Sequence, residues 1–566
     1  MTKTFYFILL LVLIVHHQAA AERFLVSNLV EFNTAQDNAN AGDSIVWQTG
    51  MYVDVYLQIN KDGLYIGAES LGGTVFTGSS RVRMNSDQVS FEGFQYVGGN
   101  IGTNDVINIY GSDILVNEIN IRAYTCYKYL RIRESSQYVA VTYCNFENRL
   151  NLDDQNILSI LVNENQPGYH KIQYCSFKNF EGTGNDMGIE PIRIGLSTQA
   201  NRISRSLVEY CYFTNCDGDG ELISSKATQN VYRFNTFEQN NKAELVLRHG
   251  SEAIVYGNFF LNGKGGVRVR EGQNHYIYNN YFFELDDRAI FLQNEDSDPL
   301  DNIQIAFNSI IDCSEVILGG DGDDPPTNVT LANNLFVDPD DDLFEDPTGN
   351  ETWLGNIASG SLGMSLPGSG ITAIDPLLVV NTFGYFELSA GSPAIDAAVT
   401  GFSALPQFPG MDPIDTDMLL DIMEQQRPVA VSDKDLGCSE FPQLIPVQPL
   451  VNEGNTGPSY NTSILTSVEE FTDEEALGIR IGPNPAQETL HLFLDLKSTA
   501  DLNVTVIDGQ GRMVRQFQKN GLHAGPQTIS MELDGLAEGV FFLHLLRNDL
   551  GGRQQQLDTI PFFILR

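Results

Sequence analysis

The chain has 566 residues and carries 73 Asp and Glu against 33 Lys and Arg, a formal net charge of −40. This balance argues against a nucleic-acid-binding protein, because phosphate affinity is built from Lys and Arg. A hydrophobic content of 42%, with 51 Gly and 22 Pro, excludes wholesale disorder and a collagen-like chain, and the length predicts two to four domains or one long repetitive one.

Residues 1–21 are predicted to be a signal peptide. Lys3 precedes the apolar run 5–15, which is too short to span a bilayer, and residues 19–21 are three alanines that form a small-residue cleavage site. No other segment approaches about 18 consecutive apolar residues. We therefore expect an exported chain with no membrane span in its mature form.

A short pattern then recurs between residues 144 and 336: Cys or Asn, any residue, and Phe or another apolar residue. It begins at Cys144, Cys175, Cys211, Asn235, Asn258, Asn280, Asn308 and Asn334. Successive copies begin 22–36 residues apart, an interval typical of a solenoid. Within each unit apolar and polar residues alternate, as in 231–237, which favours strands over helices. We expect a right-handed parallel β-helix over residues 22–445, with strands of successive coils about 4.8 Å apart. A β-sandwich is not expected here, because it needs hairpin turns every 8–12 residues or so.

Two repeat positions have a predicted structural role. The repeated Asn residues are expected to tolerate left-handed backbone and to bond to each other along the stack. The seven cysteines are odd in number, widely spaced and without a CxxC pair, which argues against a zinc site. Cys144, Cys175 and Cys211 occupy equivalent repeat positions, so we interpret them as small apolar fillers and not as a disulfide framework.

The densest group of chemically interesting residues lies between Asn185 and His275. Lys226, Arg248 and Arg270 are each 22 residues apart, which matches the local coil length, so we expect them to stack as a basic column on one face. Arg268, two residues before Arg270, shares that face by alternation. Asp219 and Glu221 share a face by the same rule.

A basic column beside paired carboxylates suits β-elimination on a uronic acid polymer. The substrate carboxylate must be neutralised so that charge can build up at the reacting carbon. A base must then remove the C5 proton, and an acid must protonate the departing O4. Lysine can act as the base only if burial and neighbouring cations lower its pKa from about 10.4. Two acids and an amide oxygen are also suitable ligands for Ca²⁺.

At these residues the sequence resembles polysaccharide lyase family 6, which includes alginate lyases and chondroitinase B. The matching motifs are Ile192–Gly195, Asp219 and Glu221 before Lys226, Arg248-His249-Gly250, and Gly265–Arg268 followed by His275 and Asn279–Phe282. The resemblance implies Lys226 as Brønsted base and Arg248 as Brønsted acid. It also implies a Ca²⁺ site formed by Asp219, Glu221 and an upstream Asn, for which Asn185 is the candidate. We expect substrate contacts from Arg193, His249, Arg268, Arg270 and His275.

The leading hypothesis is a secreted lyase that cleaves alginate, a polymer of mannuronate and guluronate. The Gly-Gly-x-Arg motif that contains Arg268 resembles that of the alginate-acting family members. Dermatan or chondroitin sulfate is the alternative substrate. A non-catalytic β-helix that binds polysaccharide at the cell surface is the alternative from another class, in which Lys226 and Arg248 would only neutralise the ligand.

The repeat fades after Phe336, and the solenoid is expected to end near residue 445, with a linker over 446–478. Residues 479–566 form a separate module, in which alternating Leu490, Leu492 and Leu494 predict a small antiparallel β-sandwich. The module is similar to the C-terminal sorting domain of the type IX secretion system of Bacteroidetes. Its matching motifs are Pro483-Asn484-Pro485, Asp508-x-x-Gly511-Arg512 and Gly539–Leu543. This implies export through the periplasm, with that machinery as a partner; an accessory carbohydrate-binding sandwich is the alternative.

The net charge of −40 does not exclude a polyanionic ligand. Residues 193–270 carry ten Lys and Arg against seven Asp and Glu, a local charge of +3. We therefore expect an anionic polysaccharide to bind in one local basic groove, helped by a cation, on a surface that is otherwise acidic.

Overall fold

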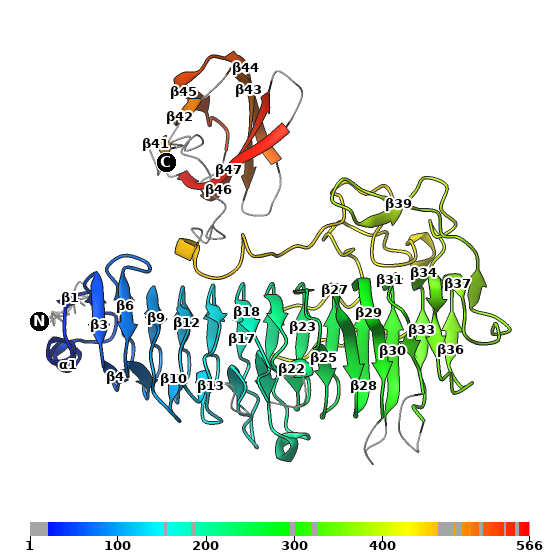
Figure 1. Ribbon diagram of the computed structural model, residues 1–566, viewed down its shortest axis with the longest axis horizontal. Coiled ribbons are helices and arrows are strands. Elements are labelled where there is room, and N and C mark those ends of the chain that lie inside the picture. The colour runs from blue at the N-terminus through cyan, green and yellow to red at the C-terminus, as the bar shows by residue number, and fades with distance from the viewer. Residues whose placement is uncertain are drawn as a thin grey trace, which may run out of the picture. The chain divides into compact units, whose positions relative to one another are not determined.

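The computed structural model describes residues 21–151, 155–182, 188–294, 300–319, 325–461, 480–482, 489–496, 499–508, 513–536, 539–549 and 554–564. Nearly all of the predicted signal peptide lies outside these residues. The chain divides into two compact units, Met1–Thr462 and Ser463–Arg566. The first unit contains the predicted parallel β-helix (Figure 1).

Each coil of the β-helix passes through three faces, and strands of successive coils pair in parallel. The first face holds β1 (Arg23–Val26), β2 (Ser44–Trp47), β5 (Tyr65–Ala68), β8 (Ser90–Glu92), β11 (Leu115–Asn117), β14 (Ala140–Thr142), β17 (Lys171–Gln173), β20 (Leu207–Glu209), β23 (Val231–Arg233), β26 (Ile254–Tyr256), β28 (Gln273–Tyr278), β30 (Asp301–Ala306), β33 (Thr330–Ala332) and β36 (Thr352–Leu354).

The second face holds β3 (Gly50–Val53), β6 (Thr74–Thr77), β9 (Phe94–Val97), β12 (Asn120–Arg122), β15 (Asn145–Glu147), β18 (Ser176–Phe180), β21 (Tyr212–Cys216), β24 (Thr236–Glu238), the first halves of β27 (Phe259–Val269) and β29 (Tyr281–Leu292), β31 (Ser309–Ile311), β34 (Leu335–Asp342), β37 (Asn356–Ser361) and β38 (Ile371–Ala373).

The third face carries the residues of interest. It holds β4 (Tyr56–Ile59), β7 (Arg81–Met84), β10 (Asp105–Ile109), β13 (Lys128–Ile132), β16 (Leu158–Ile160), β19 (Ile192–Ile194), β22 (Glu221–Ser225), β25 (Glu244–Leu247), the second halves of β27 and β29, β32 (Val316–Ile317) and β35 (Phe344–Glu345).

Ladders of identical side chains fill the interior, as the repeat predicts. Phe rings stack with centroids 4.7–5.1 Å apart along Phe146, Phe177, Phe213, Phe237, Phe260 and Phe282. Side-chain amides bond at 2.9–3.0 Å along Asn235, Asn258, Asn280, Asn308, Asn334 and Asn356. These ladders hold neighbouring coils in register, because each member contacts its equivalent in the next coil.

The role predicted for the repeated Asn as a left-handed residue is wrong. The left-handed position is the residue before it, and it is held by Tyr143, Tyr174, Tyr210, Phe234, Gly257, Asn279, Phe307, Asn333 and Gly355. The Asn that follows has a different task. Its amide oxygen accepts the backbone N–H of the preceding coil, as Asn258 does from Asn235, so it satisfies the corner backbone.

All seven cysteines are buried and free. Cys144, Cys175 and Cys211 occupy the ladder position that Asn holds in later coils, and they lie in the main apolar core. This confirms the prediction that they act as interior fillers.

Helix α1 (Leu29–Asn38) packs against β1, β2 and β4 at the start of the β-helix. Its N-cap Asn28 accepts the backbone N–H of Glu31, and buried Phe32 lies 5.9 Å from the Trp47 ring between centroids. The helix therefore covers the first coil, whose apolar interior would otherwise meet water.

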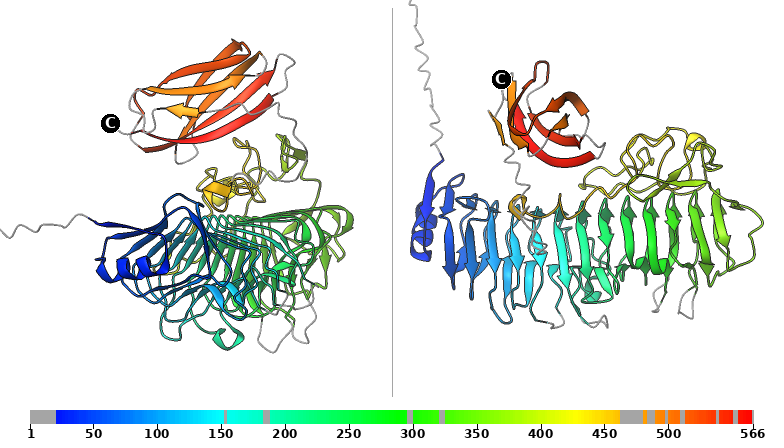
Figure 2. Two further views of the ribbon diagram at one scale, coloured as in Figure 1. Left: turned by 60° about the vertical axis from the view of Figure 1, so that its left-hand side comes forward. Right: turned by 45° about the horizontal axis from the view of Figure 1, so that its top comes forward.

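A long strap, residues 374–461, returns along the outside of the first and second faces (Figure 2). It contains the hairpin of β39 (Leu378–Val380) and β40 (Phe386–Leu388) and the short 3-10 turns Val431–Asp433 and Ser459–Asn461. Apolar strap residues such as Leu405 and Phe408 cover Tyr278 and Phe307, and Ile422 covers Tyr281. The strap thus buries outward-facing aromatic residues that a bare solenoid would expose.

The predicted linker boundary at residue 446 differs from the structure. Residues 446–461 still lie on the β-helix, where the Ser459 N–H donates to Glu118 at 2.6 Å and the Tyr460 hydroxyl donates to the Phe94 carbonyl at 3.1 Å. The polar composition of residues 446–461 suggested a segment without contacts to the β-helix, but these hydrogen bonds attach it to the early coils.

The C-terminal unit contains two antiparallel sheets. One has the order β41 (Arg480–Gly482), β42 (Thr489–Leu496), β45 (Gly525–Glu532); the other has the order β44 (Met513–Leu522), β43 (Ala500–Asp508), β46 (Gly539–Asp549), β47 (Gln554–Ile564). Leu490, Leu492 and Leu494 are buried in its core, as their alternation predicts. Within the described part of the whole chain, no helix is long and apolar enough to cross a membrane.

Candidate active site

One ladder position runs unbroken along the outside of the third face. Successive strands pair Gln58, Arg83, Asn108, Arg131, Ser159, Arg193, Ser224, Val246, Arg268, Phe291, Ile317 and Glu345. Neighbouring positions are about 4.8 Å apart. The β-helix therefore sets the spacing of Arg193 and Arg268 through its backbone.

Lys226, Arg248 and Arg270 form the predicted basic column two positions further along each strand. The Arg248 N–H donates to Ser225 in the coil before, and the Arg270 N–H donates to Leu247 in the same way, both at 2.9 Å. Each residue therefore stands one coil above the last. Arg268 and Arg270 are partly exposed on either side of buried Val269, so both point outward, as alternation predicts.

Three buried carboxylates face these cations. Glu190 binds Arg193 through contacts of 2.6–3.0 Å, and Glu221 binds Arg248 at 2.5 Å. Glu244, in the next coil, pairs with Arg268 at 3.4 Å and with Arg288 at 2.8 Å. The cations keep 14–22% of their side-chain surface exposed while the acids are 1–3% exposed. Positive charge is thus presented at the surface and negative charge lies beneath it.

The pKa values follow from this layering. Burial, together with the charge of Arg193 and Arg248, lowers the pKa of Lys226 below its ordinary value, against the opposing pull of Glu221 and Glu190. Burial also raises the pKa of Glu190. Although burial acts on Glu221 in the same direction, Arg248 reverses it and holds the pKa of that carboxyl below its usual range. Lys226 is therefore more easily deprotonated than a lysine on a free surface.

The residues predicted to hold calcium fit that ion in part. Asp219 is buried and accepts the backbone N–H groups of Gly188 and Glu221, at 2.5 and 3.1 Å. Glu221 keeps a second, buried oxygen without a hydrogen-bond partner among the described residues, which is the kind of donor that Ca²⁺ takes. Within those same residues no three acidic, His or Cys side chains gather as a metal site, and Asn185 lies outside them.

The two predicted histidines have different positions. His249 is partly exposed; Nδ1 lies 2.7 Å from Glu271 and Nε2 lies 3.0 Å from Ser197. His275 is buried, accepts the Ala253 N–H at Nδ1, and is bonded through Nε2 to the Glu271 carbonyl. Burial lowers the pKa of His275 to about 4. We therefore assign His275 a structural role and not the predicted contact with substrate, because both of its ring nitrogens bind the backbone.

Lys128 is a site neighbour that the sequence analysis missed. It lies on β13, is 5% exposed, and its Nζ binds Asn156 and Gln155. Burial, reinforced by Arg131 and Arg193, lowers its pKa to about 7. Nothing in the sequence marks it, because the coils between Lys128 and Arg193 are longer and irregular and carry no repeat of its spacing.

A family model described as Chondroitinase B matches residues 26–312, just over half of the chain. The chain belongs to the chondroitinase B family. The match to this family includes every site residue described above. No curated protein matches the chain.

Solved structures of polysaccharide lyase family 6 share the fold of this family member. AlyGC, a PL6 family alginate lyase, matches with a TM-score of 0.60 and 21% identity over 65% of this chain and 55% of AlyGC. A mannuronic acid specific family 6 lyase from human gut microbiota matches at 0.54 and 23%, over 60% and 86%. A PL6 alginate lyase in complex with a trisaccharide matches at 0.53 and 18%, over 66% and 92%. The chain thus spans about half the length of AlyGC.

The C-terminal unit also matches a family. Residues 480–555 match the secretion system C-terminal sorting domain. The predicted sorting domain is confirmed, and it indicates secretion or export to the cell surface.

Proposed function

We propose that this chain is an exported lyase that cleaves alginate by β-elimination, with Lys226 as the base and Arg248 as the acid. The observation that carries the proposal is the basic column itself. Lys226, whose pKa is lowered, stands one coil from Arg248 and beside Arg193. A base of lowered pKa among fixed cations is what proton removal next to a carboxylate requires.

In the proposed reaction, uncharged Lys226 accepts the C5 proton of a uronate residue. The electron pair of that C–H bond forms the C4–C5 double bond while the C4–O4 bond breaks. Arg248 donates a hydrogen bond to the departing O4. The guanidinium pKa exceeds about 12, so Arg248 is a weak acid. The proton on O4 therefore comes either from Arg248 itself or from a water molecule that Arg248 orients. Arg193, Arg268 and Arg270 neutralise the carboxylates of the bound chain, with His249 at the edge of the site.

The proposal includes a Ca²⁺ ion, with Asp219 and Glu221 as its ligands. When bound, it would supply positive charge for the substrate carboxylate. The buried second oxygen of Glu221 supports this assignment.

Alginate is favoured over other polymers because the solved family 6 lyases of similar fold are described as alginate or mannuronate lyases. The family model carries the name chondroitinase B, which supports dermatan or chondroitin sulfate as the second candidate. Both candidates are uronate polymers and use the same chemistry at C5 and O4.

The test is to incubate the purified protein with alginate, polymannuronate, polyguluronate and dermatan sulfate and to follow the ultraviolet absorbance of the unsaturated ends. We expect alginate and at least one of its component polymers to give the signal. Lys226→Arg keeps the charge but removes the base, so we expect kcat to fall by at least about 100-fold while polymer binding is retained. No signal from any polymer would instead support a non-catalytic binding protein.

Chelation tests the calcium ligands separately. We expect exhaustive chelation to lower the rate and Ca²⁺ to restore it in the wild-type protein. Direct calorimetric titration with Ca²⁺ should show binding that Glu221→Gln weakens. An unchanged rate and no binding heat would remove the metal from the proposal and leave the Lys226 and Arg248 roles in place.

A further inference from the structure

The ladder that passes through the site continues upstream as a row of arginines. Arg83 and Arg131 occupy the same ladder position as Arg193, and Arg133 occupies the position that leads through Leu161 and Gly195 to Lys226. Arg83 lies four coils from Arg193, roughly 19 Å, and Arg133 lies three coils from Lys226, roughly 14 Å. These distances are within reach of a single bound polysaccharide chain.

Aromatic rings hold this row in place. The Arg83 guanidinium lies 4.1 Å from the centroid of the ring of Tyr110, which directly follows β10, and the Arg133 guanidinium lies 5.0 Å from the same centroid. The neighbouring pairs Arg81 over Tyr56 and Arg131 over Tyr127 repeat the arrangement at 4.1 and 4.6 Å. Hydrogen bonds add to this stacking, since Arg83 Nε donates to Asn85 at 2.6 Å and Arg133 Nε donates to Asn108 at 2.8 Å. Each arginine side chain is thus fixed, with further N–H groups at the guanidinium edge that can donate to an anion.

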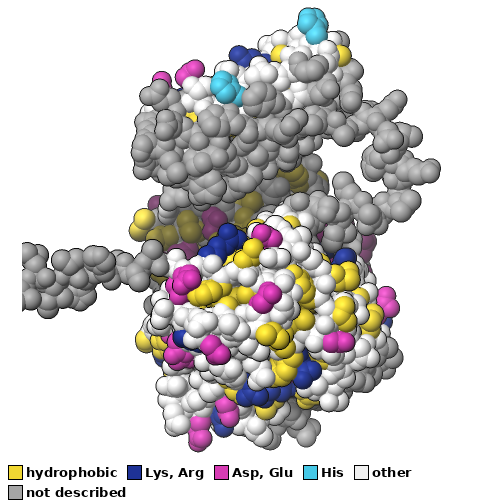
Figure 3. Space-filling view, turned by 90° about the vertical axis from the view of Figure 1, so that its left-hand side faces the viewer, with side chains coloured by type: hydrophobic (Ala, Val, Ile, Leu, Met, Phe, Trp, Pro, Cys, Tyr) yellow, Lys and Arg dark blue, Asp and Glu magenta, His cyan; other side chains and the backbone are white. Residues whose placement is uncertain are grey.

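Acidic groups are scarce along this part of the face. Among the described residues of β4, β7, β10 and β13, Asp105 is the acid, and it is 5% exposed beneath Arg131 and Arg133, at 3.5 and 3.4 Å. Beyond the strand ends, Asp62 and Asp87 accept backbone N–H groups of the next coil, and exposed Glu134 pairs with Arg202 at 3.5 Å. In Figure 1 the labels of β4, β10 and β13 follow the lower edge, and Figure 3, a view onto the end that carries α1, shows Lys and Arg gathered at this edge.

The same face reverses its charge downstream of the site. The ladder ends at Glu345, which is exposed, and Glu315 and Asp287 are half-buried nearby. Burial and the neighbouring carboxylate of Glu345 raise the pKa of Glu315 to about 7. A polyanion extending from Lys226 is therefore attracted toward β13, β10 and β7 and is repelled beyond β29.

We propose that Arg83, Arg131 and Arg133, fixed by Tyr110 and Tyr127, form an upstream track that binds the carboxylates of the substrate chain, so that the polymer extends from the reacting site toward the N-terminal coils. The track rests on the proposed lyase function for its place in catalysis, but it binds a polyuronate whether or not that chain is cleaved. Uronates beyond the reacting pair contribute affinity there, and the acidic end of the face limits the chain on the other side.

The experiment compares the double variant Arg83→Gln/Arg133→Gln with wild type on polymeric alginate and on the shortest oligosaccharide that the enzyme cleaves. Each lost contact is partly exposed, so we expect KM for the polymer to rise about five- to twenty-fold with kcat unchanged. The kinetics on the short oligosaccharide should not change, since it does not reach the track. Arg83→Lys/Arg133→Lys should restore much of the polymer affinity.

Arg122→Gln is the matched control, because Arg122 is an exposed arginine on the second face, away from the site. Equal losses on polymer and short oligosaccharide, or no loss on polymer, would overturn the track. Binding of polymannuronate to the Lys226→Arg protein, with and without the double substitution, gives the same decision without turnover. If the protein binds polymer through the track but cleaves none of the polymers, the proposed function is contradicted and the track is still supported.

Discussion

The lowered pKa of Lys226, the proposed base, comes from its position in the fold and not from a single partner. The residue directly follows β22 on the third face, where burial, Arg193 and Arg248 act together to lower its pKa and the buried acids oppose them. A lysine at the same ladder position on a free surface would keep its ordinary pKa. In the proposed reaction, the cations that bind the substrate are therefore the same groups that lower the pKa of the base.

This predicts the pH profile of the reaction. Because only uncharged Lys226 accepts a proton, kcat/KM should rise with pH and level off once the lysine has lost its own proton, at a pH below that expected of a free lysine. Arg193→Gln removes a charge that lowers the pKa of Lys226, so the rising limb should move to higher pH. Rate measurements from pH 6 to 10, with Arg122→Gln as the control, check the direction of the shift; a limb that does not move would assign the base elsewhere.

At the scale of the elements, the Asn ladder joins one coil to the next. Asn280 is buried, its oxygen accepts from the backbone and side chain of Asn258, and its amide donates to Asn308 and to the Val255 carbonyl. One side chain therefore satisfies groups in the coil before and in the coil after its own. Cys211 holds the same position in an earlier coil, where its thiol makes only long contacts with carbonyls.

We expect Asn280→Ala to destabilise the protein much more than Cys211→Ala. The first leaves the buried backbone N–H of Asn258 without its acceptor and removes one of the hydrogen bonds to Asn308, which costs about 2–4 kcal/mol. The second removes a small apolar group for about 1 kcal/mol. Thermal unfolding followed by circular dichroism measures the two midpoints side by side. Similar shifts for both variants would show that the ladder acts by packing alone.

The sequence was sufficient to predict the strands of the repeat and part of the candidate site. The 22-residue spacing of Lys226, Arg248 and Arg270 predicted their stacking, because coils of equal length bring equal positions together. It was insufficient where coil lengths vary, so the register of Arg131 with Arg193 could not be counted along the chain. His275 was misassigned because a motif gives the order of residues but not which side chains turn inward.

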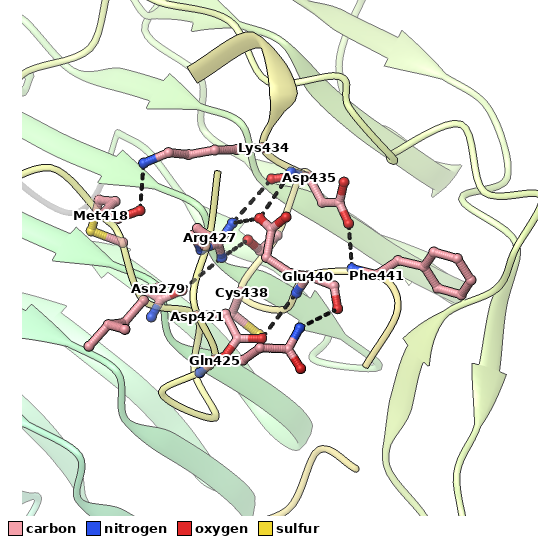
Figure 4. A network of polar contacts seen from close by, with 12 residues as sticks. Asn279, Met418, Asp421, Gln425, Arg427, Lys434, Asp435, Cys438, Glu440 and Phe441 are labelled. Carbon is pink, nitrogen blue, oxygen red and sulfur yellow. Dashed lines mark hydrogen bonds and ion pairs between the residues drawn. The ribbon is translucent and has the colours of Figure 1, made fainter. Parts of the chain in front are cut away.

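At the scale of the whole first unit, the strap is fixed to the β-helix by a buried ionic network (Figure 4). Arg427 is fully buried and donates to Glu440 at 2.6 Å, to Asn279 of the solenoid at 3.0 Å and to the Gly437 carbonyl at 2.9 Å. Burial raises the pKa of Glu440 to about 7 against the pull of Arg427. Elsewhere the strap is joined to the solenoid by half-exposed pairs, such as Lys171 with Asp412 at 2.7 Å.

The two connections predict different effects on stability. Arg427→Met leaves Glu440 buried without its cation, so we expect a loss of about 3–5 kcal/mol and early proteolytic cleavage within the strap. Lys171→Met removes a solvent-exposed pair and should cost less than about 1 kcal/mol. Limited proteolysis with mass spectrometry locates the cuts. Cleavage spread evenly over the coils would argue that Arg427 stabilises the solenoid and not the strap.

The construction of the third face has a consequence for how such an enzyme can change. At a given ladder position each coil contributes one residue, and its distance from Lys226 along the solenoid is set by how many coils intervene. A coil gained or lost between β7 and β13 would alter how long a stretch of polymer is held and would leave the reacting groups untouched. In the proposed enzyme, chain-length preference and bond-breaking chemistry are therefore separately adjustable, the first by duplication or deletion of a coil and the second by point substitution.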